Sequence, residues 1–394
     1  MSLPFLDLRA GYLELKPEID DAVSRVFDSG QYILGAEVQA FEHEWAKFCD
    51  ARFSVGVANG LDALELALMA LGVGPGDEVL VPSNTYIATW LAVSNVGAIP
   101  VPVEPEEDSY NIDVNLIEEA ITRRTTAIVP VHLYGQPADL DPILEIAKRH
   151  KLWVVEDAAQ AHGARYRGRR IGGHSHVVAW SFYPGKNLGA FGDAGAITTD
   201  SEVIADRIRV LRNYGSRVKY LNESQGVNSR MDPIQAAALR VKLKYLDEWN
   251  ARRAKIADRY LDLSKKLAQA IEVQSELEGR LSNRAASPSL QLRFPEVLSG
   301  TDPVWHLFVV RSRGRDSLVG RLAERNIETL IHYPTPPNRQ NAYKELAVAS
   351  QPIAELLSSE VFSLPIGPQM KLSDSERVFR ALAQGVKADS KLVE

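Results

Sequence analysis

The chain has 394 residues, with 45 Lys and Arg against 51 Asp and Glu and a formal net charge of −6. This length predicts two domains, or one large domain with an appendage. The mild acidic balance argues against nucleic acid or an anionic membrane as a partner, because binding phosphates requires a basic surface. The single cysteine, Cys49, excludes an intrachain disulfide and a cysteine-based metal site, and it fits a reducing compartment.

The N-terminal residues carry charges throughout and lack the apolar run of a secretory signal. No stretch approaches the roughly 20 uninterrupted apolar residues that a membrane-spanning helix needs. We therefore expect a cytoplasmic protein with no membrane segment.

Helical spacing of apolar residues first occurs over residues 16–29, and Gly30 follows as the expected C-terminal cap. A second helix is expected after Asn59, where apolar residues recur every three or four positions as far as Leu71.

From residue 78 to about residue 200, strand-like apolar runs alternate with helical patterns, which is typical of parallel βαβ units. The expected strands are 78–82, 99–103, 127–132, 152–156, 177–182 and 194–199. Residues 233–266 predict one or two helices.

The C-terminal third has a different pattern. Residues 273–302 predict a loop-rich surface segment, and a strand–helix–strand pattern follows at 305–311, 317–325 and 327–332. We therefore place a domain boundary near residue 250, with a large α/β domain over residues 1–250 and a smaller α+β domain over residues 251–394.

Two charged residues follow consecutive expected strands. Asp157 ends the apolar run that begins at Trp153, and Lys186 follows the next run. Open α/β sheets bind ligands at the carboxyl ends of parallel strands, so both side chains are expected in one crevice. If Asp157 is considered by itself, a structural salt bridge is enough to explain a carboxylate at the end of a buried strand. A lysine with a lowered pKa forms Schiff bases, however, and a carboxylate keeps a pyridine nitrogen protonated. The pair predicts a pyridoxal 5′-phosphate site with Lys186 and Asp157 as catalytic residues.

Such a cofactor also needs a phosphate anchor and an aromatic ring beside its own. Backbone N–H groups of Gly60 and Leu61, at the start of a helix, suit a phosphate, and Ser181 adds a hydroxyl. Tyr86 follows a strand and is the candidate for stacking. The sequence predicts no metal site, because its one closely spaced histidine pair has no third ligand nearby in sequence.

As a set, these segments resemble the DegT/DnrJ/EryC1/StrS family of sugar aminotransferases, which use pyridoxal phosphate on the type I, aspartate aminotransferase-like fold. The resemblance covers nearly the whole chain and rests on the motifs at 59–64, 156–163, 181–188, 226–236 and 332–334. It implies a large α/β domain with a mixed, mostly parallel sheet and a smaller C-terminal α+β domain.

The resemblance implies a role for each cofactor residue. Lys186 would hold the cofactor as a Schiff base and shuttle a proton, Asp157 would pair with the pyridine nitrogen, and Gln160 would lie near the ring hydroxyl. Gly60, Leu61 and Ser181 would hold the phosphate.

A second subunit is also implied, because Asn228 would reach over to the phosphate of the neighbouring site. The active sites would then lie at the interface of a homodimer. The positions that look like sugar-nucleotide contacts in this family are Tyr183, Arg230, His332, Tyr333 and Tyr32.

Two positions depart from the family pattern. Leu61 stands where many relatives have Thr, so the anchor relies more on backbone amides. Asn338 stands where a His is common, which leaves the role of that position open. A neighbouring branch of the family has His in place of the Schiff-base lysine and performs dehydration, and Lys186 argues against that reaction.

The implied reaction is a two-stage transamination from L-glutamate to a nucleotide-linked keto sugar. The segments 12–20, 30–35, 239–247 and 329–334 look most like the branch acting on dTDP-3-keto-6-deoxyhexoses, which favours amination at C3. Three alternatives stay open: amination at C4, a non-catalytic sensor of pyridoxal phosphate or a sugar nucleotide, and a different pyridoxal-phosphate enzyme such as a lyase or decarboxylase.

Overall fold

The computed structural model describes residues 2–279, 292–346 and 349–392. A seven-stranded sheet in the order β1-β9-β8-β5-β4-β2-β3 lies at its centre. The pairs from β3 to β8 are parallel, whereas β9 runs antiparallel to both β8 and β1. The strands are β1 (Phe53–Val57), β2 (Glu78–Pro82), β3 (Ile99–Val103), β4 (Thr125–Ile128), β5 (Trp153–Asp157), β8 (Val177–Ser181) and β9 (Gly195–Thr199). The predicted mixed, mostly parallel sheet is confirmed.

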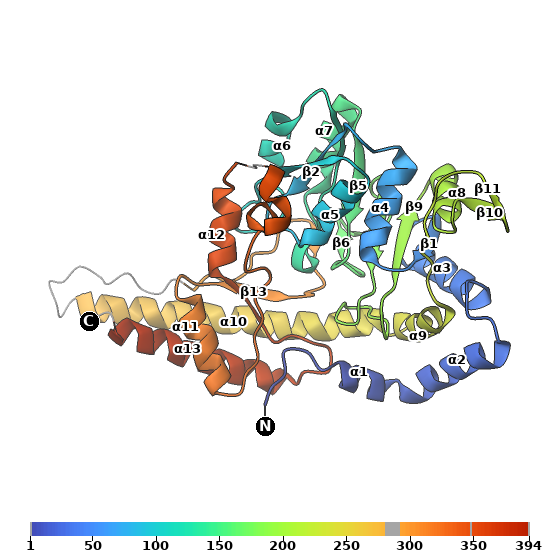
Figure 1. Cartoon of the computed structure of the whole chain (residues 1–394). Coiled ribbons are helices and arrows are strands. Elements are labelled where there is room, and N and C mark those ends of the chain that lie inside the picture. The colour runs from blue at the N-terminus through green and yellow to red at the C-terminus, as the bar shows by residue number, and fades with distance from the viewer. Residues whose placement is uncertain (1, 280–291, 347–348, 393–394) are drawn as a thin grey trace.

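Helices cover both faces of this sheet (Figure 1). Side chains alternate between the two faces of a strand, and both faces are apolar here. Val79 and Val81 of β2 pack with α4, α5 and α8 on one face, while Leu80 packs with α6 and α7 on the other. Beside β8 and β9, α3 and α9 cover that second face. The helices are α3 (Ala36–Phe48), α4 (Gly60–Leu71), α5 (Ile87–Asn95), α6 (Val114–Ala120), α7 (Leu140–His150), α8 (Glu202–Leu211) and α9 (Pro233–Leu243).

Two helices precede these layers, α1 (Leu8–Glu14) and α2 (Lys16–Ser29). Helix α2 has the predicted bounds, and Gly30 ends it in the left-handed conformation with φ of 64°, which a glycine adopts without strain. The apolar face of α2, with Ile19 and Val26, packs against α9.

The chain also forms short elements outside the main sheet. A small sheet joins β12 (Thr301–Asp302), β6 (Arg165–Tyr166) and β7 (Arg169–Arg170), and β10 (Ser216–Val218) pairs with β11 (Leu221–Asn222) as a hairpin. The 3₁₀ helices are η1 (Leu133–Gly135), η2 (Pro337–Arg339) and η3 (Asn341–Leu346).

The C-terminal part packs helices around a two-stranded antiparallel sheet of β13 and β14. Helix α10 runs along the base of the molecule with α13 beside it (Figure 1). The elements are α10 (Leu246–Gly279), β13 (Phe308–Arg311), α11 (Arg315–Glu324), α12 (Pro352–Glu360), β14 (Val361–Leu364) and α13 (Leu372–Leu392). Phe308 and Phe362, one from each strand, lie fully buried in a cluster with Tyr260 of α10.

Three predictions about local structure were wrong. The loop-rich segment predicted from residue 273 begins as helix, since α10 continues to Gly279, and residues 280–291 lie outside the described part. The strand predicted at 127–132 ends at Ile128, and Leu133–Gly135 then form η1.

The third wrong prediction is the strand at 327–332. These residues form no strand, and the partner of β13 is β14. Ile327 makes an isolated bridge with Leu3, and Leu330 makes another with Ser363. The segment is divided between two partners on different elements, so it forms no continuous ladder.

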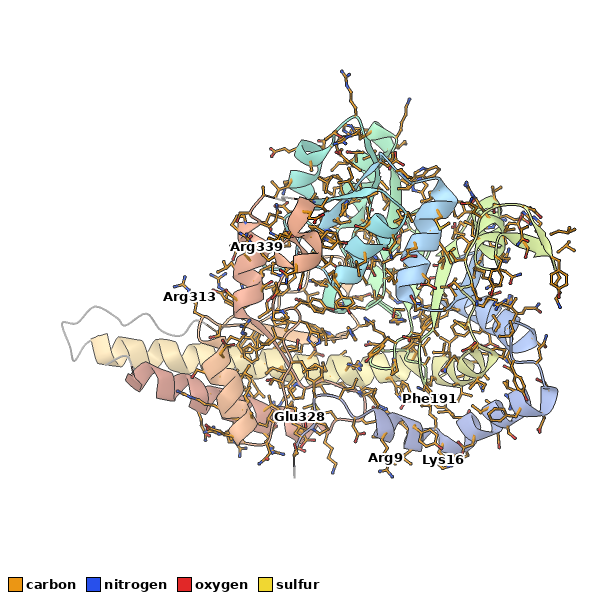
Figure 2. All side chains as sticks on the ribbon, in the orientation of Figure 1. Arg9, Lys16, Phe191, Arg313, Glu328 and Arg339 are labelled. Carbon is orange, nitrogen blue, oxygen red and sulfur yellow. The ribbon has the colours of Figure 1, made fainter. Side chains whose placement is uncertain are left out.

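The N-terminal residues are tied to this same segment. The amide of Leu3 donates to the carbonyl of Asn326 at 2.8 Å, and the amide of Phe5 donates to the carboxylate of Glu328 at 3.2 Å. Figure 2 labels Glu328 at the lower edge of the molecule, near the C-terminal helices. The first residues of the chain therefore pack with its last third.

We retain the domain boundary near residue 250 as a proposal. Along α10, Leu246 and Trp249 belong to apolar clusters of the N-terminal part, whereas Ile256 and Tyr260 belong to the C-terminal cluster. Leu3 also joins the C-terminal cluster, so the first residues would belong to the smaller domain.

No helix in the described part of the chain is both long and apolar enough to cross a membrane.

Candidate active site

Asp157 is the last residue of β5 and lies at the carboxyl end of the parallel strands. Its side chain is 6% exposed and accepts two hydrogen bonds, from the hydroxyl of Thr89 at 2.8 Å and from the amide of Ala159 at 3.2 Å. Burial raises the pKa of Asp157, while these two hydrogen bonds and the positive charge of Lys186 act in the opposite direction.

Lys186 lies in the loop after β8, the strand that pairs with β5. Its amide donates to the carbonyl of Tyr183 at 2.8 Å, which forms a tight turn. Burial lowers the pKa of Lys186 to about 8, and the negative charge of Asp157 partly offsets this effect. The lysine and the carboxylate are therefore close enough to influence each other, as their positions after neighbouring strands predict.

Three histidines also lie within electrostatic range of Lys186. Burial and the charge of Lys186 lower the pKa of His162 to about 3 and that of His332 to about 4, and they lower the pKa of His306 well below its ordinary value. The lowered pKa values favour the neutral form of these imidazoles, so they add no positive charge beside Lys186.

The start of α4 lies against the end of β8. A Cβ atom on Gly60 would stand 2.5 Å from Cβ of Ser181, so only glycine permits this approach. Asn59 caps the helix by accepting from the amide of Asp62 at 2.8 Å. Among the described residues, no acceptor takes a hydrogen bond from the amides of Gly60 or Leu61. Two free N–H groups at a helix N-terminus, beside a serine hydroxyl, suit a phosphate.

Aromatic and amide side chains from distant segments meet beside these residues. The ring of Tyr86, which is 54% exposed, lies 5.2 Å from the ring of Tyr333 between centroids. Gln160 donates from its side-chain amide to the hydroxyl of Tyr333 at 3.1 Å. His332 shares a 2.8 Å hydrogen bond between Nδ1 and the hydroxyl of Ser363. The fold thus brings the segment 332–333 to the end of β5.

The other candidate residues have no such contacts within one chain. Tyr183 is 59% exposed, and Arg230 donates to the side chain of Asn213 at 3.0 Å. Tyr32 is 51% exposed, and its hydroxyl donates to the carbonyl of Phe27 at 3.3 Å. Asn228 is exposed. In the described part of the chain, no hydrogen bond or ring contact links Tyr32, Arg230 or Asn228 to Lys186 or Asp157.

Asn338, whose role the sequence leaves open, is buried beside α12. Its side-chain amide donates to Glu355 at 3.2 Å, and Arg339 pairs with the same carboxylate at 2.9 Å. Figure 2 labels Arg339 next to this helix. In this position Asn338 helps to hold η2 against α12.

Two polar residues of the site were missed at the sequence level. Thr89 contacts Asp157, and His306 shares a 3.2 Å hydrogen bond between its Nδ1 and Oδ1 of Asn187, the residue after Lys186. Both stand within otherwise apolar segments, Thr89 before Trp90 and His306 between Trp305 and Leu307. A polar side chain inside a buried apolar run needs a hydrogen-bond partner. Their position in such runs is therefore the sequence feature that indicates Thr89 and His306.

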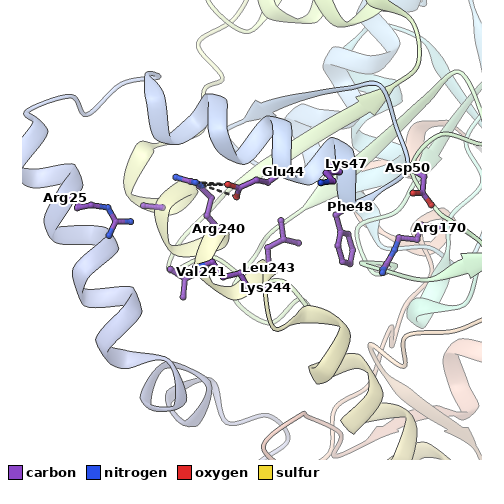
Figure 3. A pocket seen from close by; sticks show the side chains of 11 residues that line it. Arg25, Glu44, Lys47, Phe48, Asp50, Arg170, Arg240, Val241, Leu243 and Lys244 are labelled. Carbon is purple, nitrogen blue, oxygen red and sulfur yellow. Dashed lines mark hydrogen bonds and ion pairs between the residues drawn. The ribbon is translucent and has the colours of Figure 1, made fainter.

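A separate groove of about 640 Å³ lies between α2, α3 and α9 and contains none of these residues (Figure 3). We call it the Arg240 groove. Arg240 donates to Glu44 at 2.6 Å and Arg170 donates to Asp247 at 2.7 Å. These two arginines are thus already paired with carboxylates. We call the residues gathered around Lys186 the Lys186 cluster: Lys186, Asp157, Gly60, Leu61, Ser181 and Tyr86. The chemistry of this cluster, and not the size of the groove, identifies the candidate active site.

The Lys186 cluster fits pyridoxal phosphate on several independent features. It provides an amine with a lowered pKa, a buried carboxylate, an exposed aromatic ring and two amides without acceptors at a helix N-terminus. Each corresponds to one part of the cofactor: aldehyde, pyridine nitrogen, ring face and phosphate.

Comparison with known proteins decides the family. The model of the DegT/DnrJ/EryC1/StrS aminotransferase family matches residues 14–383. The chain belongs to this family. The predicted family, the aminotransferase activity and the type I fold are thereby confirmed.

One DegT/DnrJ/EryC1/StrS relative is the dTDP-3-amino-3,4,6-trideoxy-alpha-D-glucose transaminase of Streptomyces venezuelae. It is 53% identical over 384 residues, which cover 97% of this chain and 96% of the relative. The chain is also similar to S. venezuelae DesV, whose X-ray crystal structure contains a ketimine intermediate. The two sequences are 51% identical, and the structural match covers 98% of this chain and 99% of that chain with a TM-score of 0.91.

A second solved structure addresses the cofactor. It is the crystal structure of NtdA from Bacillus subtilis with the bound cofactor PMP. The two sequences are 32% identical, and the structural match covers 98% of this chain and 85% of that chain with a TM-score of 0.86. PMP is the amino form of pyridoxal phosphate. Together with the fit of the Lys186 cluster, this likeness confirms the predicted cofactor.

Proposed function

We propose that this aminotransferase moves the amino group of L-glutamate to C3 of a dTDP-linked 3-keto-6-deoxyhexose. The observation that carries the cofactor chemistry is the amine of Lys186, which follows β8 and interacts with the buried carboxylate of Asp157 at the end of the neighbouring β5. The S. venezuelae relative, whose name specifies a dTDP sugar with an amino group at C3, supports the substrate. The glutamate donor, and the cytoplasmic location predicted from the N-terminal sequence, stay predictions.

Pyridoxal phosphate, when bound, supplies a pyridinium ring that withdraws electrons from the carbon bearing the amino nitrogen. Lys186 would be the residue that moves protons at that carbon. With a pKa of about 8, a substantial part of its amine is neutral near physiological pH and able to act as a general base. Lys186 would serve both as the covalent anchor and as the proton shuttle.

Asp157 would hold the ring nitrogen protonated. Its two hydrogen bonds, from Thr89 and Ala159, favour the ionised carboxylate although the side chain is buried. The amides of Gly60 and Leu61 and the hydroxyl of Ser181 would hold the phosphate.

The sugar nucleotide would bind on the exposed side of this cluster. Tyr86 and Tyr183, which are both more than half exposed, would present aromatic surface there, and Gln160 donates to the hydroxyl of Tyr333. Arg230 would supply positive charge toward the diphosphate, as the family resemblance implies.

We further propose that the active enzyme is a homodimer. The hairpin of β10 and β11 exposes three large apolar side chains, Val218 at 59%, Tyr220 at 85% and Leu221 at 64%. A cluster of this kind favours an interface over solvent. Asn228 follows the hairpin and is also exposed, so a partner subunit seated on the hairpin would be close to its side chain.

The test is the absorption spectrum of the purified enzyme. We expect L-glutamate to convert the cofactor to its amino form, and dTDP-3-keto-6-deoxyglucose to reverse the change. A parallel sample receives the 4-keto sugar. If only the 4-keto sugar reverses the change, the enzyme aminates C4 and not C3. If L-glutamate leaves the absorption spectrum unchanged, the proposed amino donor is wrong.

A further inference from the structure

Two buried hydroxyl groups form a chain that ends on Asp157. The hydroxyl of Thr89 lies 2.8 Å from Oδ2 of Asp157, and the hydroxyl of Thr85 lies 2.9 Å from that of Thr89. Thr85 is 2% exposed and Thr89 is 1% exposed, so solvent does not compete for either group.

The direction of this chain follows from the chemistry of its end. An ionised carboxylate only accepts hydrogen bonds, so the hydroxyl of Thr89 donates to Asp157. Its oxygen is then available to accept from Thr85. Each donated bond increases the polarity of the next, and the chain as a whole stabilises the negative charge of Asp157.

We propose that Thr89, supported by Thr85, is a positioning residue that keeps Asp157 ionised and aimed at the pyridine nitrogen. The proposal rests on the proposed role of Asp157. It deepens that role by assigning the groups that maintain the carboxylate in a buried site.

The position of Thr89 in the fold strengthens this assignment. Tyr86 is the N-cap of α5, and Thr89 lies one turn later in the same helix. One short segment therefore presents an aromatic ring toward the ring-binding side and a hydroxyl toward Asp157. The amide of Ala159 holds the other carboxylate oxygen at 3.2 Å, so both oxygens of Asp157 are fixed.

The other charged or titratable groups that act on Asp157 do not replace this donor. Lys186 and His132 influence the carboxylate through charge, and Tyr333 responds to its charge without a hydrogen bond to it. His132 is committed elsewhere, because its Nε2 lies 2.9 Å from Glu156. Removing the hydroxyl of Thr89 leaves Oδ2 of Asp157 buried without a donor among the described residues.

The experiment compares Thr89→Val, which removes the hydroxyl at nearly constant volume, with Thr89→Ser, which keeps it. For Thr89→Val we expect kcat to fall by about tenfold or more, since a hydrogen bond to a buried charge is lost. The acid limb of the pH profile should move to higher pH, because Asp157 then protonates more easily. The dissociation constant of pyridoxal phosphate, titrated into the apoenzyme, should rise. Thr89→Ser should restore all three, and Thr85→Val should show a smaller change in the same direction.

Thr198→Val is the matched control. Thr198 is a buried threonine of β9, whose hydroxyl accepts from Trp180 at 2.9 Å and donates to the carbonyl of Gly172 at 2.8 Å. This variant should lower the melting temperature without moving the pH profile or the cofactor dissociation constant.

Two outcomes would overturn the proposal. If Thr89→Val keeps the wild-type pH profile and cofactor affinity while Asp157→Asn is inactive, the hydroxyl chain is merely structural and the proposed role of Asp157 stands. If Asp157→Asn is itself fully active, the role of Asp157 and the proposal fail together. Should Thr89→Val not fold, Thr85→Val decides between these outcomes through the same three measurements.

Discussion

The Lys186 cluster and the Arg240 groove both gather charged side chains, but they differ in what those side chains contact. In the groove, Arg240 and Arg170 are already neutralised by carboxylates at 2.6 and 2.7 Å. In the cluster, Lys186 has no hydrogen-bond partner for its amine among the described residues, and its pKa is lowered to about 8. A concave surface lined by satisfied ion pairs stabilises the fold, whereas convergent and unsatisfied polar groups indicate chemistry.

The largest expected effect comes from Lys186→Ala. This variant removes the amine that anchors the cofactor and moves the proton, so turnover should fall by at least about a thousandfold. Borohydride treatment followed by spectroscopy checks the covalent link. A reducible, covalently attached cofactor in the variant would contradict the assignment of Lys186.

Asp157→Asn should fold normally and lose turnover by about a hundredfold or more, because a neutral amide does not stabilise a pyridinium ring. Steady-state kinetics with thermal unfolding as the folding control measures this. Near-normal turnover would show that another group protonates the ring.

The lowered pKa of Lys186 gives a pH prediction for the apoenzyme. Only the neutral amine attacks the aldehyde of the cofactor, so the rate of covalent attachment should rise with pH and level off above about 8. Below that pH the rate should fall by about tenfold per unit. Stopped-flow absorbance measures the rate of attachment. If the midpoint of its pH dependence lies near 10.5, the ordinary pKa of a lysine, then burial does not lower the pKa of Lys186.

Asn228→Ala should raise the cofactor dissociation constant by about tenfold, since it removes one hydrogen bond to a charged phosphate. Mixed dimers with Lys186→Ala test whether the site is shared. If Asn228 acts across the interface, each mixed dimer contains one intact site and regains activity. Absence of any rescue would place Asn228 in its own subunit's site or outside both sites.

The smallest effect is expected in the groove. Arg240→Gln should lower the free energy of unfolding by about 1 kcal/mol through loss of its pairs with Glu44 and Glu37. Its kcat/KM should equal that of the wild type. A loss of activity without a loss of stability would give the Arg240 groove a function of its own.

Much of the N-terminal part of the chain was predictable because its signals are local. The bounds of α2, β2 and β3 match the predicted ranges, since helical spacing and short apolar runs are properties of neighbouring residues. The segment 327–332 was mispredicted because its pairing with Leu3 and Ser363 depends on residues far away in sequence.

The sequence by itself determined where the candidate site lies, because Asp157 ends β5, Lys186 follows β8, and neighbouring parallel strands end at the same edge of a sheet. The tertiary structure decided how that chemistry is supported. Thr89 reaches Asp157 across 68 positions, and Gln160 reaches Tyr333 across 173. No local pattern encodes such contacts, since they exist only once burial has brought the segments together and excluded water from the polar groups between them.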